Sequence, residues 1–313
     1  MMHLISLKDW SQEQIAEVLD LAAEMKGEPE TFQNAMHRKV LVMIFEKPSL
    51  RTRVSFETGM YQMGGNAIYY DISTSPLGKG KESIHDTVKT LSRYANLVMA
   101  RLFEHEKIEE MARWSDIPVI NGLTDFSHPC QVVSDLLTIR EYKGSLKGLS
   151  LAYLGDANNN VTHSLLYGCP KMGIHVRVGC PEGEGFNPLP EVLQQAREEG
   201  DRSGASVAVT HDPYEAVEGA DVIYTDSWMS YQVPPEELEE RVKVLMPFQV
   251  NTEKMERGAP EVIFMNCLPA LRGYEQTTEV IDGPRSVVFD QAENRLHTQK
   301  AIMVTLLRQA ASL

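Results

Sequence analysis

The chain has 313 residues, of which 42% are hydrophobic and 24% charged, a composition typical of an ordinary globular protein. Its formal net charge of −14 argues against nucleic acid or an anionic membrane as a partner, because both are bound through positive surfaces. No apolar run approaches the roughly 20 residues that a membrane-spanning helix needs, and the first residues do not resemble a secretory signal, so we expect a cytoplasmic location.

The elements predicted in chain order begin with a helix. Ser11 and Gln14 match a capping box, and the residues that follow repeat at helical spacing. An apolar run of strand length covers residues 40–45. A second helix is predicted after it, and its expected apolar face carries Val54, Phe56, Met60 and Met63.

The turn between that strand and that helix reads Lys47-Pro48-Ser49-Leu50-Arg51-Thr52-Arg53. A strand that enters a helix through such a turn offers backbone N–H groups, the positive end of a helix dipole, hydroxyl groups and guanidinium charge. Phosphate suits this combination, since arginine keeps its charge and offers planar donors. The turn therefore predicts an anion site, with a capped surface helix carrying two solvated arginines as the alternative.

Short apolar runs continue along the whole chain. In the first half they cover residues 67–71, 97–100 and 118–122, with a helical stretch ending near Tyr94. From Leu149 the strand-like runs are LSLAYLGD, IHVRVGCP, SVAVTHD, DVIYTD, VIFMNCLP and SVVFDQ, most of them separated by amphipathic segments such as LPEVLQQAREEG. This alternation predicts the α/β class, with parallel sheets covered on both faces. Two series indicate two domains, with a boundary near residues 143–147, where Gly144 and Ser145 break a helix.

Polar residues gather where these strands end, as expected for the binding crevice of an open α/β sheet. The clusters are Thr124–Gln131, Gly155–Asn160, Thr225–Ser230 and Asn266–Pro269. Each also has a structural interpretation: His128-Pro129 as a helix start, the asparagine run as a turn, Asp226 as an N-cap and Cys267 as a buried thiol. The other cysteines are interpreted as core residues, since the four have no C-x-x-C spacing and predict neither a zinc site nor a disulfide framework.

Six motifs in this order resemble those of the aspartate/ornithine carbamoyltransferase family, and its ornithine-specific members most closely. They are EKPSLRTRVSFE, HPCQVVSDLLTI, GDANNNVTHSLL, TDSWMS, NCLPALRG and FDQAENRLHTQKA. The resemblance implies two doubly wound parallel-sheet domains with the active site in the cleft between them, and a C-terminal helix packed on the first domain. It assigns residues 1–142 plus 292–313 to carbamoyl phosphate and residues 143–291 to the amino acid.

The resemblance also implies which residues bind the donor, carbamoyl phosphate. The matching phosphate positions are Ser49, the main chain of Leu50, Arg51, Thr52, Arg53 and Arg295. The carbamoyl group would lie among Thr52, Arg101, His128 and Gln131. Arg101 and His128 would stabilise charge on its carbonyl oxygen while the amine attacks, which is electrostatic preorganisation.

For the acceptor, the resemblance implies transfer to the side-chain amine of ornithine, giving citrulline and phosphate. The matching residues are Asn160, Asp226, Ser230, Tyr231, Cys267 and Leu268. Asp226 suits an ammonium, while Asn160 and Ser230 can donate to a carboxylate. Cys267 is interpreted as an orienting or proton-handling group, since the chemistry needs no covalent enzyme intermediate. No metal or organic cofactor is implied.

The chain departs from the family pattern at the acceptor site. Tyr231-Gln232 stands where the family has Met-Gly, and Asn266 replaces a titratable histidine. Two alternatives therefore stay open: a carbamoyltransferase for another amine, or a binding paralogue without activity. Among other amines, aspartate is disfavoured because residues 225–235 contain no arginine, and putrescine because it has no amino acid head group for Asn160 and Asp226 to bind.

The segment STSPLGKGKESIHDT corresponds to a family loop that reaches a neighbouring subunit. Its candidate donors are Ser75, Lys79 and Lys81, with a solvated glycine-lysine loop as the alternative. A shared site predicts a homotrimer or a multimer of trimers. The resemblance fits a role in arginine biosynthesis, and citrulline breakdown stays open.

Overall fold

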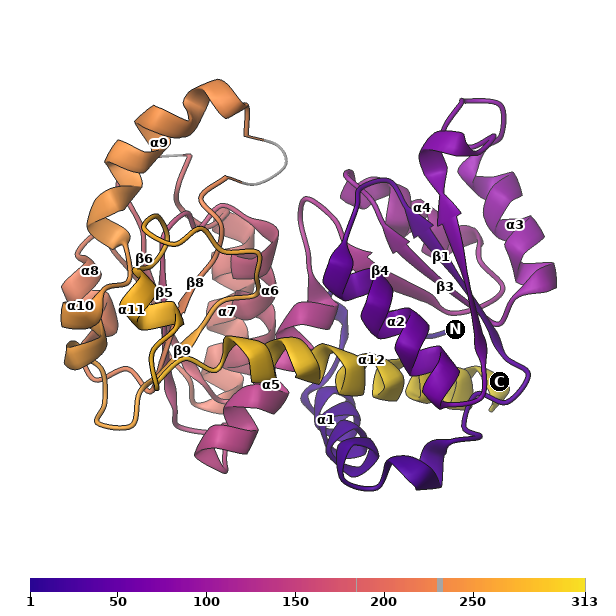
Figure 1. Cartoon of the computed structure of the whole chain (residues 1–313), viewed down its shortest axis with the longest axis horizontal. Coiled ribbons are helices and arrows are strands. Elements are labelled where there is room, and N and C mark those ends of the chain that lie inside the picture. Colours follow the sequence, from indigo (N-terminus) through magenta and orange to yellow (C-terminus); the bar gives the residue numbers. More distant parts are fainter. Residues whose placement is uncertain (184, 230–232, 313) are drawn as a thin grey trace. The chain divides into compact units, whose positions relative to one another are not determined.

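The protein is represented by a computed structural model that describes residues 1–183, 185–229 and 233–312. It divides into two compact units (Figure 1). Unit 1 comprises Met1–Leu137 and Glu293–Leu313, and unit 2 comprises Thr138–Ala292. Each unit is built on one parallel sheet, so the predicted α/β class is confirmed. None of the helices in the described ranges is long and apolar enough to cross a membrane.

Unit 1 carries a four-stranded sheet in the order β2-β1-β3-β4. Its strands are β1 (Val40–Phe45), β2 (Asn66–Asp71), β3 (Leu97–Arg101) and β4 (Val119–Leu123). Its helices are α1 (Gln12–Gly27), α2 (Leu50–Gln62), α3 (Ile84–Tyr94), α4 (His105–Trp114), the first part of α5 (Pro129–Lys143) and most of α12 (Val288–Ala311), with short 3₁₀ helices at Leu7–Asp9, Pro29–Phe32 and Ile72–Thr74.

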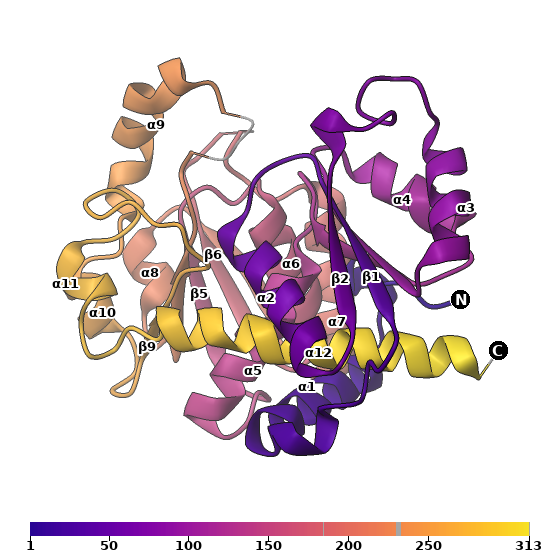
Figure 2. The ribbon, with the colours of Figure 1, turned by 45° about the vertical axis from the view of Figure 1, so that its right-hand side comes forward.

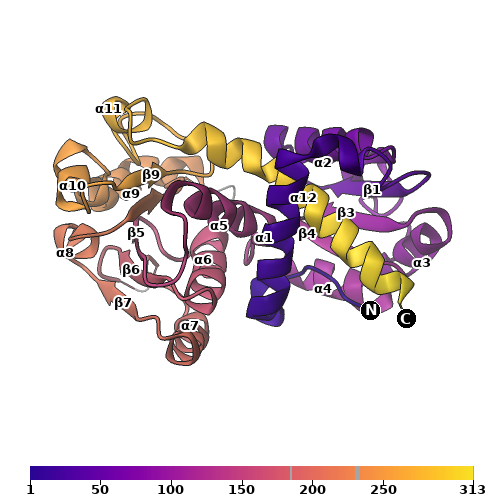
Figure 3. The same ribbon diagram turned by 90° about the horizontal axis from the view of Figure 1, so that it is seen from below.

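The two faces of this sheet are covered by different helices. Side chains of α3 and α4 pack with strand residues on one face, where the buried cluster includes Val42, Ile44, Val88, Val98, Ile108 and Met111. Helices α1, α2 and α12 cover the other face (Figure 3). Burial of these apolar surfaces supplies the main favourable term for folding of the unit.

The first two helices form largely where the sequence predicts them. At Ser11 the capping box with Gln14 is present, which confirms the predicted helix start. Ser49 caps α2, and its hydroxyl accepts the Thr52 N–H at 3.2 Å. Phe56 and Met60 are buried as expected, but the side chain of Val54 is 49% exposed, so that part of the predicted apolar face was wrong.

Unit 2 carries a five-stranded sheet in the order β7-β6-β5-β8-β9. Its strands are β5 (Ser150–Leu154), β6 (His175–Gly179), β7 (Val207–Thr210), β8 (Val222–Thr225) and β9 (Ile263–Met265). Its helices are α6 (Asn160–Lys171), α7 (Pro190–Ser203), α8 (Pro213–Val217), α9 (Leu238–Leu245), α10 (Thr252–Arg257) and α11 (Thr278–Ile281), with 3₁₀ helices at Pro235–Glu237 and Met246–Phe248. Helices α8, α10 and α11 lie on one side of the sheet and α6 and α7 on the other (Figure 2).

One predicted strand was wrong. The run SVVFDQ forms only an isolated bridge between Ser286 and Phe264, and α12 begins at Val288. Such a short apolar run cannot be told from the start of a buried helix by periodicity alone. Here the helix-forming residues that follow Phe289 decide the outcome, because they continue the segment as a helix of 24 residues.

Strand order places particular loops at the functional end of each sheet. In unit 1 the chain runs from β1 outward to β2 and then returns to β3 on the other side of β1. In unit 2 it runs from β5 to β6 and β7 and then returns to β8 on the other side of β5. Ligands of open α/β sheets bind beyond the carboxyl ends of strands at such switch points. We therefore expect ligand-binding residues in the loops after β1, β3, β5 and β8.

Candidate functional site

A cluster of buried positive charge lies at the switch point of unit 1, centred on Thr52. Arg101, the last residue of β3, donates from Nη1 to the Thr52 hydroxyl at 3.5 Å. Arg295 of α12 donates from Nη2 to the same oxygen at 3.2 Å. The two arginines are only 6% and 2% exposed. Two permanently charged guanidinium groups that converge on one hydroxyl suit the binding of an anion.

The guanidinium of Arg295 is held from several sides. Its Nη1 donates to Gln131 Oε1 at 2.7 Å, and Gln131 Nε2 donates in turn to Asp135 Oδ1 at 2.8 Å. Turned so that its oxygen faces Arg295, the Gln299 amide accepts from Nη2 at 2.8 Å and from Nε at 3.1 Å. The Asp135 bond fixes which end of the Gln131 amide faces the arginine, so the chain keeps the guanidinium in one orientation.

Electrostatics at the cluster favour a neutral histidine. His128 is 4% exposed and directly precedes α5. Burial lowers its pKa well below the ordinary value, and the charges of Arg295, Arg101, Lys47 and Arg51 lower it further. These side chains therefore act on one point, and a neutral imidazole there can donate a hydrogen bond without adding charge.

Lys47 also belongs to this cluster, although the sequence reasoning did not include it among the site residues. Burial and the charge of Arg101 lower its pKa to about 8, with Asp125 and Glu46 acting in the opposite direction. Its Nζ lies 4.6 Å from the centre of the Phe103 ring. The sequence feature that could have indicated a role for Lys47 is its position at the start of the turn, directly before Pro48.

Other residues of the turn lie outside the cluster. Arg53 is exposed, pairs with Glu57 at 3.0 Å and stacks over the Tyr69 ring at 3.9 Å, so the structure does not bring its guanidinium to Thr52. The side chain of Leu50 is 71% exposed, which leaves only its main chain at the helix N-terminus. The hydroxyl of Ser49 serves as the helix cap described above.

The predicted acceptor residues lie in unit 2, and two of them are in contact. Asp226 directly follows β8, and its Oδ1 accepts a hydrogen bond from the Cys267 thiol at 3.0 Å. Asn160 opens α6, with its side chain partly buried and its carbonyl accepting from Ser164 at 2.8 Å. Ser230 and Tyr231 lie outside the described residues.

Asn266 supports the turn that carries the thiol. Its main-chain N–H donates to Gln291 Oε1 at 3.0 Å, and its Nδ2 donates to Gln276 Oε1 at 3.1 Å. Its Oδ1 accepts the N–H of Leu268 at 2.8 Å, just before the cis Leu268–Pro269 bond. Because the residue is fully buried and the amide makes bonds from both ends, its observed role is structural.

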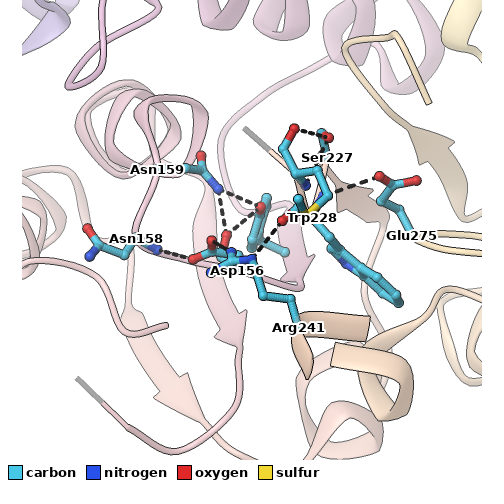
Figure 4. A network of polar contacts seen from close by, with 9 residues as sticks. Asp156, Asn158, Asn159, Ser227, Trp228, Arg241 and Glu275 are labelled. Atoms are coloured by element: carbon cyan, nitrogen blue, oxygen red, sulfur yellow. Dashed lines mark hydrogen bonds and ion pairs between the residues drawn. The ribbon is translucent and has the colours of Figure 1, made fainter. Parts of the chain in front are cut away.

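A second polar network surrounds the segment after β8 (Figure 4). Arg241 of α9 forms an ion pair with Asp156, which follows β5, and also bonds the carbonyl of Trp228. Glu275 accepts the N–H of Trp228 from the opposite side. Burial raises the pKa of both Asp156 and Glu275. Sequence reasoning did not identify Arg241 or Glu275, because neither stands in a motif at a strand end.

The loop expected to reach a neighbouring subunit is ordered by local bonds. The buried hydroxyl of Ser75 donates to the Ile72 carbonyl at 2.7 Å and accepts from the Gly78 N–H at 3.1 Å. Lys79 and Lys81 are exposed. Within residues 1–183, 185–229 and 233–312, no group of three or more His, Cys, Asp or Glu side chains could hold a metal ion.

Comparison with known proteins gives a consistent result over the whole chain. A family model described as aspartate/ornithine carbamoyltransferase, carbamoyl-P binding domain, matches residues 2–141, and the corresponding Asp/Orn binding domain matches residues 147–306. A Bacillus subtilis (strain 168) protein named ornithine carbamoyltransferase is 50% identical over 309 residues, covering 99% of this chain and 95% of the relative.

Two further comparisons extend this result. A Halobacterium salinarum protein named ornithine carbamoyltransferase, catabolic, is 48% identical over 309 residues, covering 99% of this chain and all (100%) of the relative. The solved structure of ornithine carbamoyltransferase from Pyrococcus furiosus superposes with a TM-score of 0.93 at 45% identity, covering 98% of this chain and 97% of the other.

Proposed function

The chain belongs to the aspartate/ornithine carbamoyltransferase family and is a carbamoyltransferase, and from this premise we propose that its acceptor is the side-chain amine of L-ornithine. The products are then L-citrulline and phosphate. The observation that carries the donor side of the proposal is the convergence of Arg101 and Arg295 on the Thr52 hydroxyl. Two buried, permanent cations at one point suit a small phosphate-bearing anion.

In the proposed reaction the cluster binds carbamoyl phosphate. Arg51, Thr52 and Arg295, with Ser49 and the main chain of Leu50, hold the phosphate group, and Gln131 contacts the carbamoyl group. Arg101 and the neutral His128 stabilise negative charge on the carbonyl oxygen. The amine nitrogen forms a bond to the carbonyl carbon, and the bond from that carbon to the phosphate oxygen then breaks. Phosphate leaves with the electron pair of that bond.

Unit 2 is proposed to hold the amino acid. Asp226 pairs with the α-ammonium, while Asn160 and Ser230 donate to the α-carboxylate. Cys267 and the main chain of Leu268 orient the side-chain amine, and Cys267 takes part in removing its proton as the new C–N bond forms. The 3.0 Å contact between the thiol and Asp226 supports this assignment, because it joins both groups at one place.

A substrate panel tests the proposal. Purified protein is incubated with carbamoyl phosphate and ornithine, aspartate, putrescine or another diamino acid, and phosphate release and carbamoylated product are measured. Citrulline formation with ornithine, far above the other amines, is expected. Product from aspartate and none from ornithine would reject the acceptor assignment. Carbamoyl phosphate binding without turnover of any amine would identify a binding paralogue instead.

We further propose that the active form is a homotrimer or a multimer of trimers. Helix α2 and the edge strand β2 expose a set of apolar side chains, which indicates a surface covered by another subunit. They are Leu50, Val54, Tyr61, Ile68 and Tyr69. Light scattering should give three times the 35.2 kDa chain mass, or a multiple of that value.

The loop with Lys79 and Lys81 is proposed to complete the site of the neighbouring subunit. Mixing subunits tests this directly, because an Arg101→Ala subunit and a Lys81→Ala subunit would together form one intact site in a mixed oligomer. Activity should therefore reappear on mixing two inactive variants. If both variants stay inactive in mixed oligomers, the loop acts within its own subunit.

We place the protein in the cytoplasm and in arginine biosynthesis. All four cysteines are free thiols, which suits a reducing compartment. Carbamoyl phosphate is a mixed anhydride, so transfer of its carbamoyl group to an amine is favoured chemically over the reverse reaction. Comparison of initial rates for citrulline formation and for phosphate-dependent citrulline cleavage tests the direction.

A further inference from the structure

The main chain of Trp228 is held on both sides by charged side chains (Figure 4). Its N–H donates to Glu275 Oε1 at 3.2 Å, and its carbonyl accepts from Arg241 Nε at 3.0 Å. Its indole is also 1% exposed, so the residue is fixed by packing as well. Trp228 lies two residues after Asp226 and two before Ser230. The bonds therefore hold the middle of the segment proposed to bind the amino acid.

Arg241 links this segment to the loop after β5. While its Nε bonds the Trp228 carbonyl, its Nη2 pairs with Asp156 Oδ2, and the two side chains are 13% and 10% exposed. Asp156 Oδ1 meanwhile accepts the N–H of Asn158 at 2.9 Å. The planar guanidinium serves both acceptors at once, which a lysine ammonium on its flexible stem does not reproduce.

Glu275 links the same segment to the loop after β9. Its Oε1 accepts from Trp228, and its Oε2 accepts the N–H of Leu271 at 3.0 Å. The side chain is 1% exposed, so the burial of the carboxylate is balanced by these hydrogen bonds. One carboxylate thus joins the segment that carries Asp226 to the segment that carries Cys267.

We propose that Arg241 and Glu275 are positioning residues that clamp the Trp228 main chain and thereby keep Asp226 in contact with Cys267. The hydrogen bonds that carry this inference join them to the Trp228 main chain, to Asp156 and to the Leu271 main chain. Their effect passes through the backbone on both sides of Asp226 and through the turn at Cys267. The consequence for ornithine binding rests on the proposed function, whereas the consequence for the thiol does not.

The test uses Arg241→Lys and Glu275→Gln in the full chain. The lysine keeps the positive charge beside Asp156 but cannot make the hydrogen bonds to Asp156 and to the Trp228 carbonyl at the same time. The glutamine keeps one acceptor oxygen but turns an amide NH₂ toward a backbone N–H. Matched controls are Lys243→Ala, which breaks an exposed pair with Glu240 on the same helix, and Asp282→Asn, which neutralises an exposed carboxylate.

The first readout is the rate at which iodoacetamide alkylates Cys267. The other three cysteines are buried, and a Cys267→Ser protein supplies the blank. Loss of a hydrogen bond to a charged group should raise this rate about tenfold in both clamp variants and leave it unchanged in both controls. The second readout is the KM for ornithine, which should rise about tenfold while the KM for carbamoyl phosphate stays within about twofold.

Wild-type values of both readouts in folded clamp variants would overturn the inference. A rise in both substrate KM values together would also overturn it, because that pattern indicates general loosening. If Arg241→Lys fails to fold, Asp156→Asn removes the anchor of Arg241 and should give the same changes. Should the wild type form no citrulline, the proposed function fails, but the alkylation result still decides whether the clamp exists.

Discussion

Arg295 donates a 2.7 Å hydrogen bond to Gln131, although the two residues lie far apart in the sequence. The bond connects the last helix of the chain to the helix that follows His128, and it points the guanidinium at Thr52. Protein hydrogen bonds thus orient the Arg295 guanidinium, as electrostatic preorganisation requires.

Replacement of Arg295 should therefore damage donor binding strongly. For Arg295→Ala we expect kcat/KM for carbamoyl phosphate to fall by about a thousandfold, because a buried charged donor is lost without a substitute. Steady-state kinetics with saturating ornithine measures this change. Arg113→Ala, an exposed arginine of the same unit, is the control and should behave as the wild type. A fall of less than about tenfold would contradict the assigned role.

Arg53 distinguishes the sequence-based expectation from the observed geometry. Because its guanidinium pairs with Glu57 and stacks on Tyr69, Arg53→Ala should change the KM for carbamoyl phosphate by less than about threefold. The comparison is with Arg51→Ala, whose charge acts on His128 and whose loss should abolish measurable turnover. Equal losses in both variants would show that Arg53 moves to the donor when it binds.

The pKa of Lys47 predicts how donor binding changes with pH. This pKa is about 8 in the free protein, and a bound phosphate group stabilises the charged form, so binding above pH 8 requires uptake of a proton. We expect log Kd for carbamoyl phosphate to rise by up to about one unit per pH unit above about pH 8. Calorimetry at several pH values measures this Kd. In Lys47→Met, the Kd should no longer show this dependence on pH.

The same residue predicts the opposite trend for stability of the free protein. The unfolded chain has the ordinary lysine pKa of 10.5, so between about pH 8 and 10.5 it binds more protons than the folded chain. Raising the pH across this window should therefore increase the Lys47 contribution to the free energy of unfolding. Denaturant titrations of wild type and Lys47→Met should converge with increasing pH. If the difference in free energy of unfolding between the two proteins does not change with pH, Lys47 is not desolvated in the folded state.

Asp226 should affect the acceptor more than the donor. Asp226→Asn removes the charge proposed to pair with the α-ammonium and weakens the bond with Cys267, so the KM for ornithine should rise about a hundredfold. The KM for carbamoyl phosphate should stay within about twofold. Cys267→Ser keeps a hydroxyl donor to Asp226 and should lower kcat with a smaller change in the ornithine KM. Equal effects on both substrates would argue against the assignment.

Gly155 should not tolerate a side chain. Its φ is +132°, and an added Cβ would lie 3.2 Å from Trp228 Nε1. Gly155→Ala should therefore lower the free energy of unfolding by about 1–3 kcal/mol, since backbone strain adds to the contact. Gly185→Ala is the control, because nothing lies within 4 Å of its added Cβ and no positive φ applies. A neutral Gly155→Ala would show that Trp228 shifts freely.

Local patterns were enough to predict the α/β class and most of the strands, because hydrophobic periodicity and helix capping are properties of short segments. The strand Val40–Phe45 and the start of α1 at its Ser11 cap agree with the sequence. The strand predicted for SVVFDQ was wrong, because a short apolar run is compatible with either a strand or a helix. The predicted burial of Val54 was wrong, because helical spacing alone does not define which edge of an apolar stripe faces the sheet.

Site prediction depended on a different kind of information. Thr52, Arg101 and Arg295 could be named from motifs, but their meeting at one hydroxyl depends on tertiary structure. Arg241 and Glu275 could not be named, because each acts through the backbone of Trp228 rather than through its own motif. Positioning side chains of this kind leave no local pattern in a single sequence.

The discontinuous make-up of unit 1 has a consequence for biosynthesis. Residues 1–137 leave the ribosome well before residues 293–313, so the nascent unit lacks α12 while all of unit 2 is being translated. During that interval the surface that α12 will cover is exposed, and Thr52 and Gln131 lack their hydrogen bonds with Arg295. The cluster around Thr52 can therefore be completed only after translation has passed Arg295.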